Sequence, residues 1–170
     1  VVDVDPVPRQ SVAESTGSLA VESIHGLDGV DAAVVAVSTA HHAEVGCALM
    51  ERGIHCLVEK PLAGNLDDAQ LLLTAADDAG VVLQVGHVER FNPAVRQLRE
   101  TLADESVLAV NARRMSATSG RVTDIDVVMD LMVHDFDVVL SLMGDGIPNV
   151  VARGVEGVSG HDHVTALLSF

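Results

Sequence analysis

The sequence has few basic residues. Ten lysines and arginines stand against 25 aspartates and glutamates in 170 residues, which gives a formal charge of −15. Such a surface repels nucleic acid phosphates and anionic lipid head groups, so we expect neither nucleic acid nor membrane partners. Apolar runs such as 32–37 and 81–85 are far shorter than the roughly 20 residues of a spanning helix, and no signal peptide is evident.

Cysteine is also scarce. Cys47 and Cys56 are the two cysteines, and their spacing is not that of a CxxC motif. This pattern is typical of small buried side chains in a reducing compartment rather than of a disulfide framework. We therefore expect a cytoplasmic protein.

Lysine occurs once, at Lys60, beside nine arginines, and aspartate outnumbers glutamate sixteen to nine. An acidic, lysine-poor surface can keep a protein soluble in high salt, where self-repulsion is screened. A GC-rich genome would deplete lysine as well, so both explanations stay open. A lysine retained alone suggests a chemical role, and the alternative is a surface lysine left by chance.

The first ninety residues alternate strand and helix patterns. Apolar, β-branched segments predict strands, and segments of helical spacing between them predict helices. Short connections between such elements specify βαβ units. We therefore predict a fold of the α/β class for residues 1–90, a doubly wound parallel sheet covered on both faces. The predicted strands are 1–4, 32–37, 54–58 and 81–85, and the predicted helices are 6–12, 41–52 and 66–79.

Residues 91–170 have a different pattern, which predicts the start of an α+β domain with a mostly antiparallel open sheet. The chain begins on an apolar run without methionine and ends on a strand pattern with no terminator, so we expect an internal piece of a longer protein. The predicted helices are 94–102 and 126–143, the strands are 107–115, 150–158 and 163–170, and a polar loop covers 116–123.

Several candidate ligand-binding residues follow the predicted strands, because open parallel sheets bind ligands beyond the carboxyl ends of their strands. Asp3 is placed to accept both hydroxyls of an adenosine ribose, although an aspartate before a helix is more often a cap. Ser38 and Thr39 could offer hydroxyls and free N–H groups to a dinucleotide. His42 and His87 also lie where a ligand could reach, although histidines at such positions are more often structural or solvated.

The segment Glu59-Lys60-Pro61 follows a strand pattern typical of the interior. The lysine therefore emerges at the ligand edge of the sheet, and the proline biases Lys60 toward an extended conformation. The alternative is a lysine that extends into solvent from a strand end.

A row of ionisable residues marks the helix predicted over 126–143. Spacings of four and three place Asp130, His134 and Asp137 along one face of an otherwise apolar helix. Such groups are costly inside a hydrophobic helix unless they are paired or used. We interpret Asp130 and His134 as a proton-handling pair in which the carboxylate orients the imidazole. A satisfied buried pair and a metal site are the alternatives, and no third and fourth metal ligands are evident.

Four segments in order resemble the glucose-fructose oxidoreductase, inositol dehydrogenase and rhizopine catabolism (Gfo/Idh/MocA) family, and the resemblance covers nearly the whole chain. Residues 86–94 and 126–135 further resemble a subgroup that includes UDP-N-acetylglucosamine 3-dehydrogenases. The four segments are Val37 to His42, Glu59 to Ala63, Gly86 to Pro93, and Asp130 to Asp137.

The resemblance implies an NAD(P)-dependent oxidoreductase with a Rossmann domain and a C-terminal α+β domain whose open sheet forms homodimers or homotetramers. The family's catalytic lysine maps to Lys60, and its active-site aspartate and histidine map to Asp130 and His134. A small-molecule sugar, cyclitol or nucleotide-sugar is the implied substrate. The implied cofactor-binding residues are Asp3, Ser38, Thr39, His42, Glu59, Lys60, Pro61 and Arg90.

Two departures from the family pattern affect the cofactor site. The glycine-rich GxGxxG turn is absent, as expected if the chain begins at the second strand of the fold. The usual Thr-Pro after the fourth strand appears as Ser38-Thr39-Ala40. A structural or truncated product without half of its nucleotide site, and a non-catalytic sugar or dinucleotide sensor, therefore remain alternatives.

The chemistry fits the residues. Oxidation of a secondary alcohol needs a base and a cation that stabilises alkoxide character, which we assign to His134 and Lys60, with Asp130 orienting. We expect NAD as the cofactor, with NADP possible. A carboxylate at Asp3 would repel a 2′-phosphate, and no basic residue lies beside it in the sequence, the nearest being Arg9.

Overall fold

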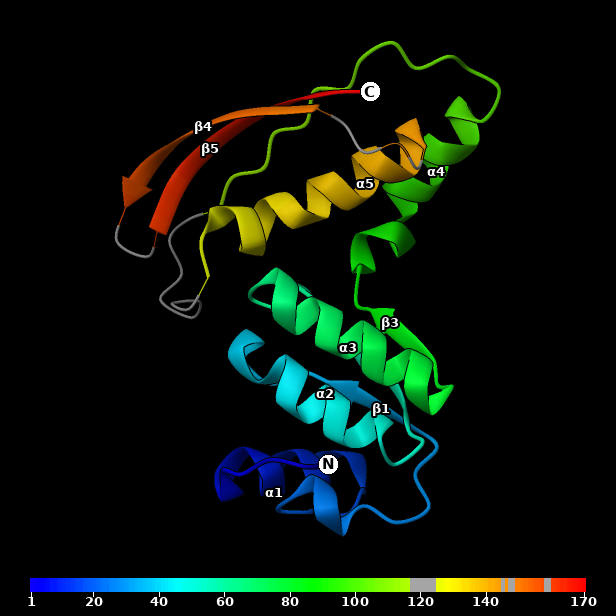
Figure 1. Cartoon of the computed structure of the whole chain (residues 1–170), viewed down its shortest axis with the longest axis vertical. Coiled ribbons are helices and arrows are strands. Elements are labelled where there is room, and N and C mark those ends of the chain that lie inside the picture. The colour runs from blue at the N-terminus through cyan, green and yellow to red at the C-terminus, as the bar shows by residue number, and fades with distance from the viewer. Residues whose placement is uncertain (117–124, 145, 147–148, 158–159) are drawn as a thin grey trace.

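A computed structural model describes residues 1–116, 125–144, 146, 149–157 and 160–170, and the polar loop predicted at 116–123 falls almost wholly outside them. The chain forms a three-stranded sheet with its helices and, further along, a two-stranded hairpin, and Figure 1 shows the hairpin at the opposite end of the molecule from the N-terminus. The elements are α1 (Pro6–Thr16), β1 (Ala32–Val35), α2 (His42–Met50), β2 (His55–Val58), α3 (Leu66–Ala79), β3 (Leu83–Val85), α4 (Pro93–Leu102), α5 (Val133–Met143), β4 (Asn149–Gly157) and β5 (Gly160–Ser169).

The first sheet is parallel, with the strand order β1-β2-β3, as the alternating pattern predicts. Helix α2 follows β1 and helix α3 follows β2, so each connection is a βαβ unit. The Asn65 side chain accepts the Asp68 N–H and begins α3. Gly80 ends it in the left-handed conformation with φ 66°, as predicted for a glycine C-terminal cap.

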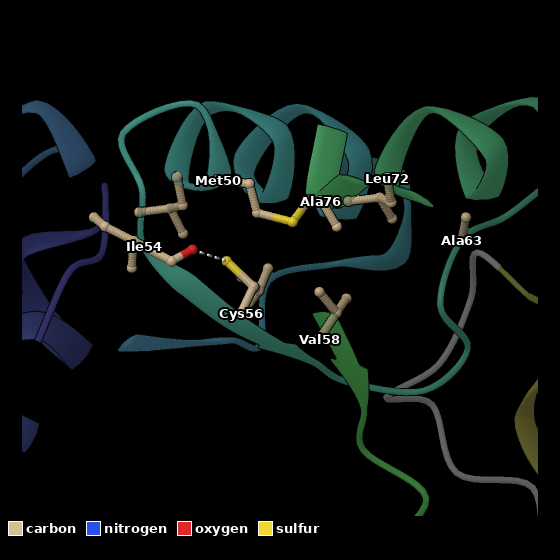
Figure 2. Packing of buried hydrophobic residues seen from close by; sticks show 9 residues of the cluster. Met50, Ile54, Cys56, Val58, Ala63, Leu72 and Ala76 are labelled. Atoms are coloured by element: carbon tan, nitrogen blue, oxygen red, sulfur yellow. Dashed lines mark hydrogen bonds between the residues drawn. The ribbon is translucent and has the colours of Figure 1, made fainter. Parts of the chain in front are cut away.

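The core lies between this sheet and helices α2 and α3. Met50, Val58 and Leu72 are fully buried, and Figure 2 shows them facing one another across this space. Helices α2 and α3 approach closely at Gly46, where an added Cβ would lie 2.6 Å from Leu72 Cδ2. The close approach explains why glycine occupies a helix interior despite its low helix propensity.

The predicted burial of both sheet faces is wrong for the described residues. Helices α2 and α3 cover the face that carries Val35, Cys56 and Val58. Side chains alternate along a strand, so Val34 points to the opposite face and is 67% exposed. The continuous apolar pattern of 32–37 therefore indicates a sheet strand correctly, but in this chain helices cover one side of it.

Two predicted strands are not formed. Residues 1–4 make one parallel bridge between Val2 and Val21 instead of a strand, and residues 107–115 have no regular secondary structure. A strand persists through hydrogen bonds to neighbours on its edge. Segment 107–115 pairs with neither β4 nor β5, which pair with each other.

The second half is built around helix α5 and the antiparallel hairpin β4-β5. A π-helical turn, η4 (Val128–Met132), leads directly into α5, so the predicted helix over 126–143 is present with a wider first turn. Alternate residues of β5, namely Val164, Ala166 and Leu168, are half-buried, whereas β4 is exposed throughout. The hairpin thus has one partly covered face.

In the described part of the chain, no helix is both long and apolar enough to cross a membrane.

Candidate active site

Lys60 meets the polar face of the second half at the carboxyl end of β2. Its Nζ donates to Asp130 Oδ1 at 2.8 Å and to the Asp130 main-chain oxygen at 3.0 Å. The side chains are 21% and 29% exposed, so the pair is neither sealed nor fully hydrated. Two residues 70 positions apart in the sequence thus come together at the edge where the sequence predicts a ligand.

His134 lies one helical turn beyond Asp130. Burial lowers its pKa first, the charges of Lys60 and Arg114 lower it further, and Glu89 and Asp130 oppose them. Its Nδ1 is buried and has no hydrogen-bond partner among the described residues. An imidazole with a lowered pKa is neutral at pH 7 and can accept a proton.

The structure differs from the predicted arrangement of Asp130. Its carboxylate binds Lys60, and within the described ranges it makes no hydrogen bond to His134. The ammonium group offers a charge-assisted hydrogen bond, which is stronger than one to a neutral imidazole. Asp130 is therefore placed to orient the lysine rather than the histidine.

Arg90 is tied to the same helix face. Its Nε and Nη2 donate to both carboxylate oxygens of Asp137 at 2.6–3.0 Å, and this hydrogen bonding raises the pKa of the guanidinium. Asp137 is 7% exposed, and His87 Nε2 lies 3.9 Å from it. Arg90 was predicted to bind the cofactor. Its guanidinium instead forms an ion pair with Asp137, while half of the side chain stays exposed.

Arg114 is a site residue that sequence reasoning missed. It binds Glu89 at 3.2 Å and Asp135 at 3.0 Å, and its charge acts on His134. No local signal could have found it, because an arginine in a predicted strand normally indicates a solvated face.

His42 does not reach the ligand edge as predicted. It is 1% exposed, with Nδ1 3.0 Å from the Pro61 oxygen and Nε2 3.1 Å from the Val37 oxygen. A buried ring whose two nitrogens both face main-chain oxygens is not available to a cofactor. The pattern of a histidine after a strand could not show this, because the ring turns inward between the loops.

The other predicted ligands lie at the carboxyl edge. Ser38 is exposed, with Oγ 2.8 Å from His41 Nδ1, and Thr39 is half-buried. Glu59 packs against Gly86, where an added Cβ would lie 2.9 Å from Glu59 Oε2. The ends of neighbouring strands therefore approach closely here, and a side chain at Gly86 would require the Glu59 carboxylate to move and the Glu59 Cα, 3.3 Å from the added Cβ, to shift slightly.

Asp3 has neighbours that the sequence did not reveal. Its Oδ1 accepts the Asp5 N–H at 2.9 Å, and Arg9 Nη1 donates to its main-chain oxygen at 2.6 Å. The expectation that no basic residue lies beside Asp3 is wrong, because the first turn of α1 brings Arg9 back over it.

These features define an α/β dinucleotide-binding fold with ionisable groups gathered at the carboxyl edge of its parallel sheet. The described residues include no group of three or more histidine, cysteine, aspartate or glutamate side chains placed to hold a metal ion.

Comparisons with known proteins agree with this class. A family model described as "Oxidoreductase family, NAD-binding Rossmann fold" (GFO_IDH_MocA) matches residues 1–87. UDP-N-acetylglucosamine 3-dehydrogenase of Acidithiobacillus ferrooxidans is 37% identical over 76% of this chain and 41% of its own length. A myo-inositol dehydrogenase of Streptomyces leeuwenhoekii is 34% identical over 98% of this chain and 57% of its own. The chain belongs to the Gfo/Idh/MocA oxidoreductase family.

A solved structure shows the same fold. The A. ferrooxidans UDP-N-acetylglucosamine 3-dehydrogenase superimposes with a TM-score of 0.83 at 33% identity, covering 99% of this chain and 56% of that one. The chain thus spans about half the length of the relatives it matches. The family, the fold and the NAD-binding character of residues 1–87 follow from these matches.

Proposed function

We propose that the full-length protein is an NAD(P)-dependent dehydrogenase that transfers a hydride between nicotinamide and a secondary alcohol of a sugar, cyclitol or nucleotide-sugar. The observation that carries this proposal is the Lys60–Asp130 pair beside His134, at the carboxyl edge of an NAD-binding fold. The base and the cation that alcohol oxidation needs are both present at this edge.

The residues divide the work as follows. The neutral imidazole of His134 accepts the hydroxyl proton, and the ammonium of Lys60 stabilises the negative charge that develops on the substrate oxygen. Asp130 holds that ammonium through two hydrogen bonds. NAD, when bound, supplies the hydride acceptor. In reduction the same groups act in reverse, with the imidazolium returning the proton.

The residues present fit a nicotinamide dinucleotide. Ser38 and Thr39 stand at the carboxyl end of β1 with exposed or half-exposed side chains, and Glu59, Lys60 and Pro61 follow β2. Asp3 would accept ribose hydroxyls. The buried Nδ1 atoms of His87 and His134 lack partners in the described part of the chain. Polar atoms without partners beside a ligand edge are typical of a site completed by its ligand.

The substrate class rests on the named relatives. One acts on UDP-N-acetylglucosamine and another on myo-inositol, by their names, and both compounds carry secondary ring hydroxyls. We infer a polyhydroxylated ring as the substrate of this protein.

The outer face of the hairpin is the proposed surface for a homodimer or homotetramer. Val151 and Leu167 are directly paired and are 63% and 66% exposed. Paired apolar side chains on an open sheet face favour association. Light scattering tests this surface: Val151→Ser with Leu167→Ser should convert an oligomeric full-length protein to smaller species, and a monomeric parent protein would contradict it.

The test of function is a panel assay. Full-length protein is mixed with NAD or NADP and with aldoses, cyclitols or UDP-sugars, and nucleotide reduction is followed by absorbance. Turnover of at least one ring alcohol is expected. Binding of NADH without turnover of any compound would favour a non-catalytic sensor on the same fold.

A further inference from the structure

His42 is enclosed by three main-chain oxygens. Its Nδ1 lies 3.0 Å from the Pro61 oxygen and 3.3 Å from the Leu62 oxygen, and its Nε2 lies 3.1 Å from the Val37 oxygen. The residue is 1% exposed at the start of α2. Every atom hydrogen-bonded to the ring nitrogens is an acceptor, so a neutral ring donates to one of the two segments at a time, and the doubly protonated ring donates to both.

The two segments are the loops that carry the proposed site. Val37 directly precedes Ser38 and Thr39, and Pro61 and Leu62 directly follow Lys60. One side chain therefore connects the end of β1 to the end of β2. The strands are already paired through Val35 and Val58, whereas the loops beyond them are joined across the edge by this ring.

We infer that His42 is a positioning residue that fixes the Lys60 loop against the Ser38–Thr39 loop, and so sets where the Lys60 ammonium stands relative to the cofactor. This inference rests on the proposed function. We call the His42 contacts with Val37, Pro61 and Leu62 the His42 tether. By positioning the Lys60 ammonium, the His42 tether affects the stability of the transition state. Through Ser38 and Thr39, it acts on cofactor binding.

Histidine suits this role because its two nitrogens lie on opposite edges of one rigid ring. Asparagine places an amide nitrogen near the position of Nδ1, toward Pro61 and Leu62. Glutamine places one near the position of Nε2, toward Val37. Phenylalanine keeps the ring volume but removes the donor from a buried contact with the Pro61 oxygen and from part-buried contacts with the Leu62 and Val37 oxygens, a loss that structures normally avoid.

The first measurement is hydrogen exchange on the full-length protein without substrate. His42→Phe should speed amide exchange in both loops, residues 36–40 and 59–64, while α3 stays protected. His42→Asn should keep the protection of 59–64 better than that of 36–40, and His42→Gln should show the opposite order. Unchanged exchange in both loops of His42→Phe would overturn the tether.

The second measurement separates turnover from cofactor binding. His42→Phe should lower kcat by up to about 10²-fold, the cost of misplacing a catalytic group by about 1 Å, and should weaken NADH binding as well. Lys60→Ala should lower kcat while NADH binding is retained. Leu49→Ala is the matched control, because Leu49 is buried in the same helix at 3% exposure and packs in the core. It should lower the melting temperature but keep kcat and loop protection.

The outcomes separate the two proposals. If the parent protein turns over no ring alcohol while His42→Phe still releases both loops, the proposed function fails and the tether stands. If the parent protein is active and His42→Phe keeps its kcat and NADH affinity, the positioning role fails and the function stands. If His42→Phe does not fold, His42→Asn and His42→Gln decide through their opposite exchange patterns.

Discussion

The two halves of the chain bury their side chains very differently. Among the described residues, every buried hydrophobic side chain lies between Ala13 and Ala76. Of the residues that the structure describes beyond position 90, the buried one is the charged Asp137, and all nine residues of β4 are exposed. The first half therefore makes its own core, whereas the second half combines a helix that is half-buried along most of its length with a hairpin that is exposed at most of its residues.

Ionic contacts join the halves, because the buried apolar cluster formed by the described residues lies within the first half. Lys60 binds Asp130, Arg90 binds Asp137, and Arg114 connects Glu89 to Asp135. Partly buried ion pairs contribute little net stability, because desolvation offsets the attraction, but they require one geometry. These ion pairs, which we call the junction, thus fix the geometry of the proposed site, while the core of the first half supplies most of the free energy of folding.

The largest expected effect follows from removing the one lysine at this junction. In the full-length protein, Lys60→Ala should lower kcat by about 10²–10³-fold, the usual cost of losing one electrostatic stabiliser of the transition state. Steady-state turnover on the substrate found by the panel assay measures it. Arg99→Ala is the matched control, since it removes a positive charge from the exposed side of α4 and should leave kcat unchanged. Equal activity of Lys60→Ala and the parent protein would make Lys60 an ordinary surface residue.

A pair of leucine substitutions tests the difference in burial. Leu72→Ala, at a fully buried position, should cost about 2–5 kcal/mol of unfolding free energy, because it leaves a cavity in the first half. Leu167→Ala, at a position 66% exposed, should change it by less than about 0.5 kcal/mol in the monomer. Urea unfolding of both variants provides the values. Similar losses would show that the hairpin is part of the same core.

The sequence predicted the parallel strands and the helices between them well, because their local patterns are regular, whereas the strand predicted at 1–4 forms only one bridge. The helix predicted over 66–79 has the same bounds in the structure, and the order of the parallel strands follows from the short connections. The pattern of 32–37 could not show that Val34 is exposed, since a continuous apolar run is the same whether helices cover one face or two.

The site was predictable in its residue types but not in its pairings. The Lys60–Asp130 hydrogen bond brings the predicted strand end and the predicted helix together, whereas the roles of Lys60, Asp130 and His134 remain predictions. Which carboxylate binds which cation depends on long-range packing, so Arg90–Asp137 and the role of Arg114 had no local signal. The inward orientation of the His42 ring also depends on long-range packing, so it had no local signal.

The pH dependence of turnover tests whether the junction tunes His134. The imidazole must be neutral to accept a proton, and its pKa lies below the ordinary value of 6.5. The kcat/KM for alcohol oxidation should therefore be constant at neutral pH and fall only as the pH drops through a midpoint below 6.5. Because the Arg114 charge lowers this pKa, Arg114→Gln should move the midpoint upward.

Arg153→Gln is the control for that shift, because Arg153 lies in the exposed strand β4, away from the junction. Its midpoint should match that of the parent protein. A midpoint that stays in place in Arg114→Gln would show that the two halves are not electrostatically coupled at His134.

The smallest expected effect concerns cofactor choice, which the first half should decide alone. Asp3 should favour NAD, because its carboxylate accepts ribose hydroxyls and repels a 2′-phosphate. Arg9 stands over Asp3, with Nη1 2.6 Å from its main-chain oxygen, and offsets part of that repulsion. Arg9→Gln should therefore widen the ratio of kcat/KM for NAD to that for NADP, and Asp3→Asn should narrow it. Arg114→Gln changes a charge at the junction and should leave the ratio unaltered. A preference for NADP in the parent protein would contradict this assignment. It would mean that the Arg9 guanidinium binds the 2′-phosphate more strongly than the Asp3 carboxylate repels it.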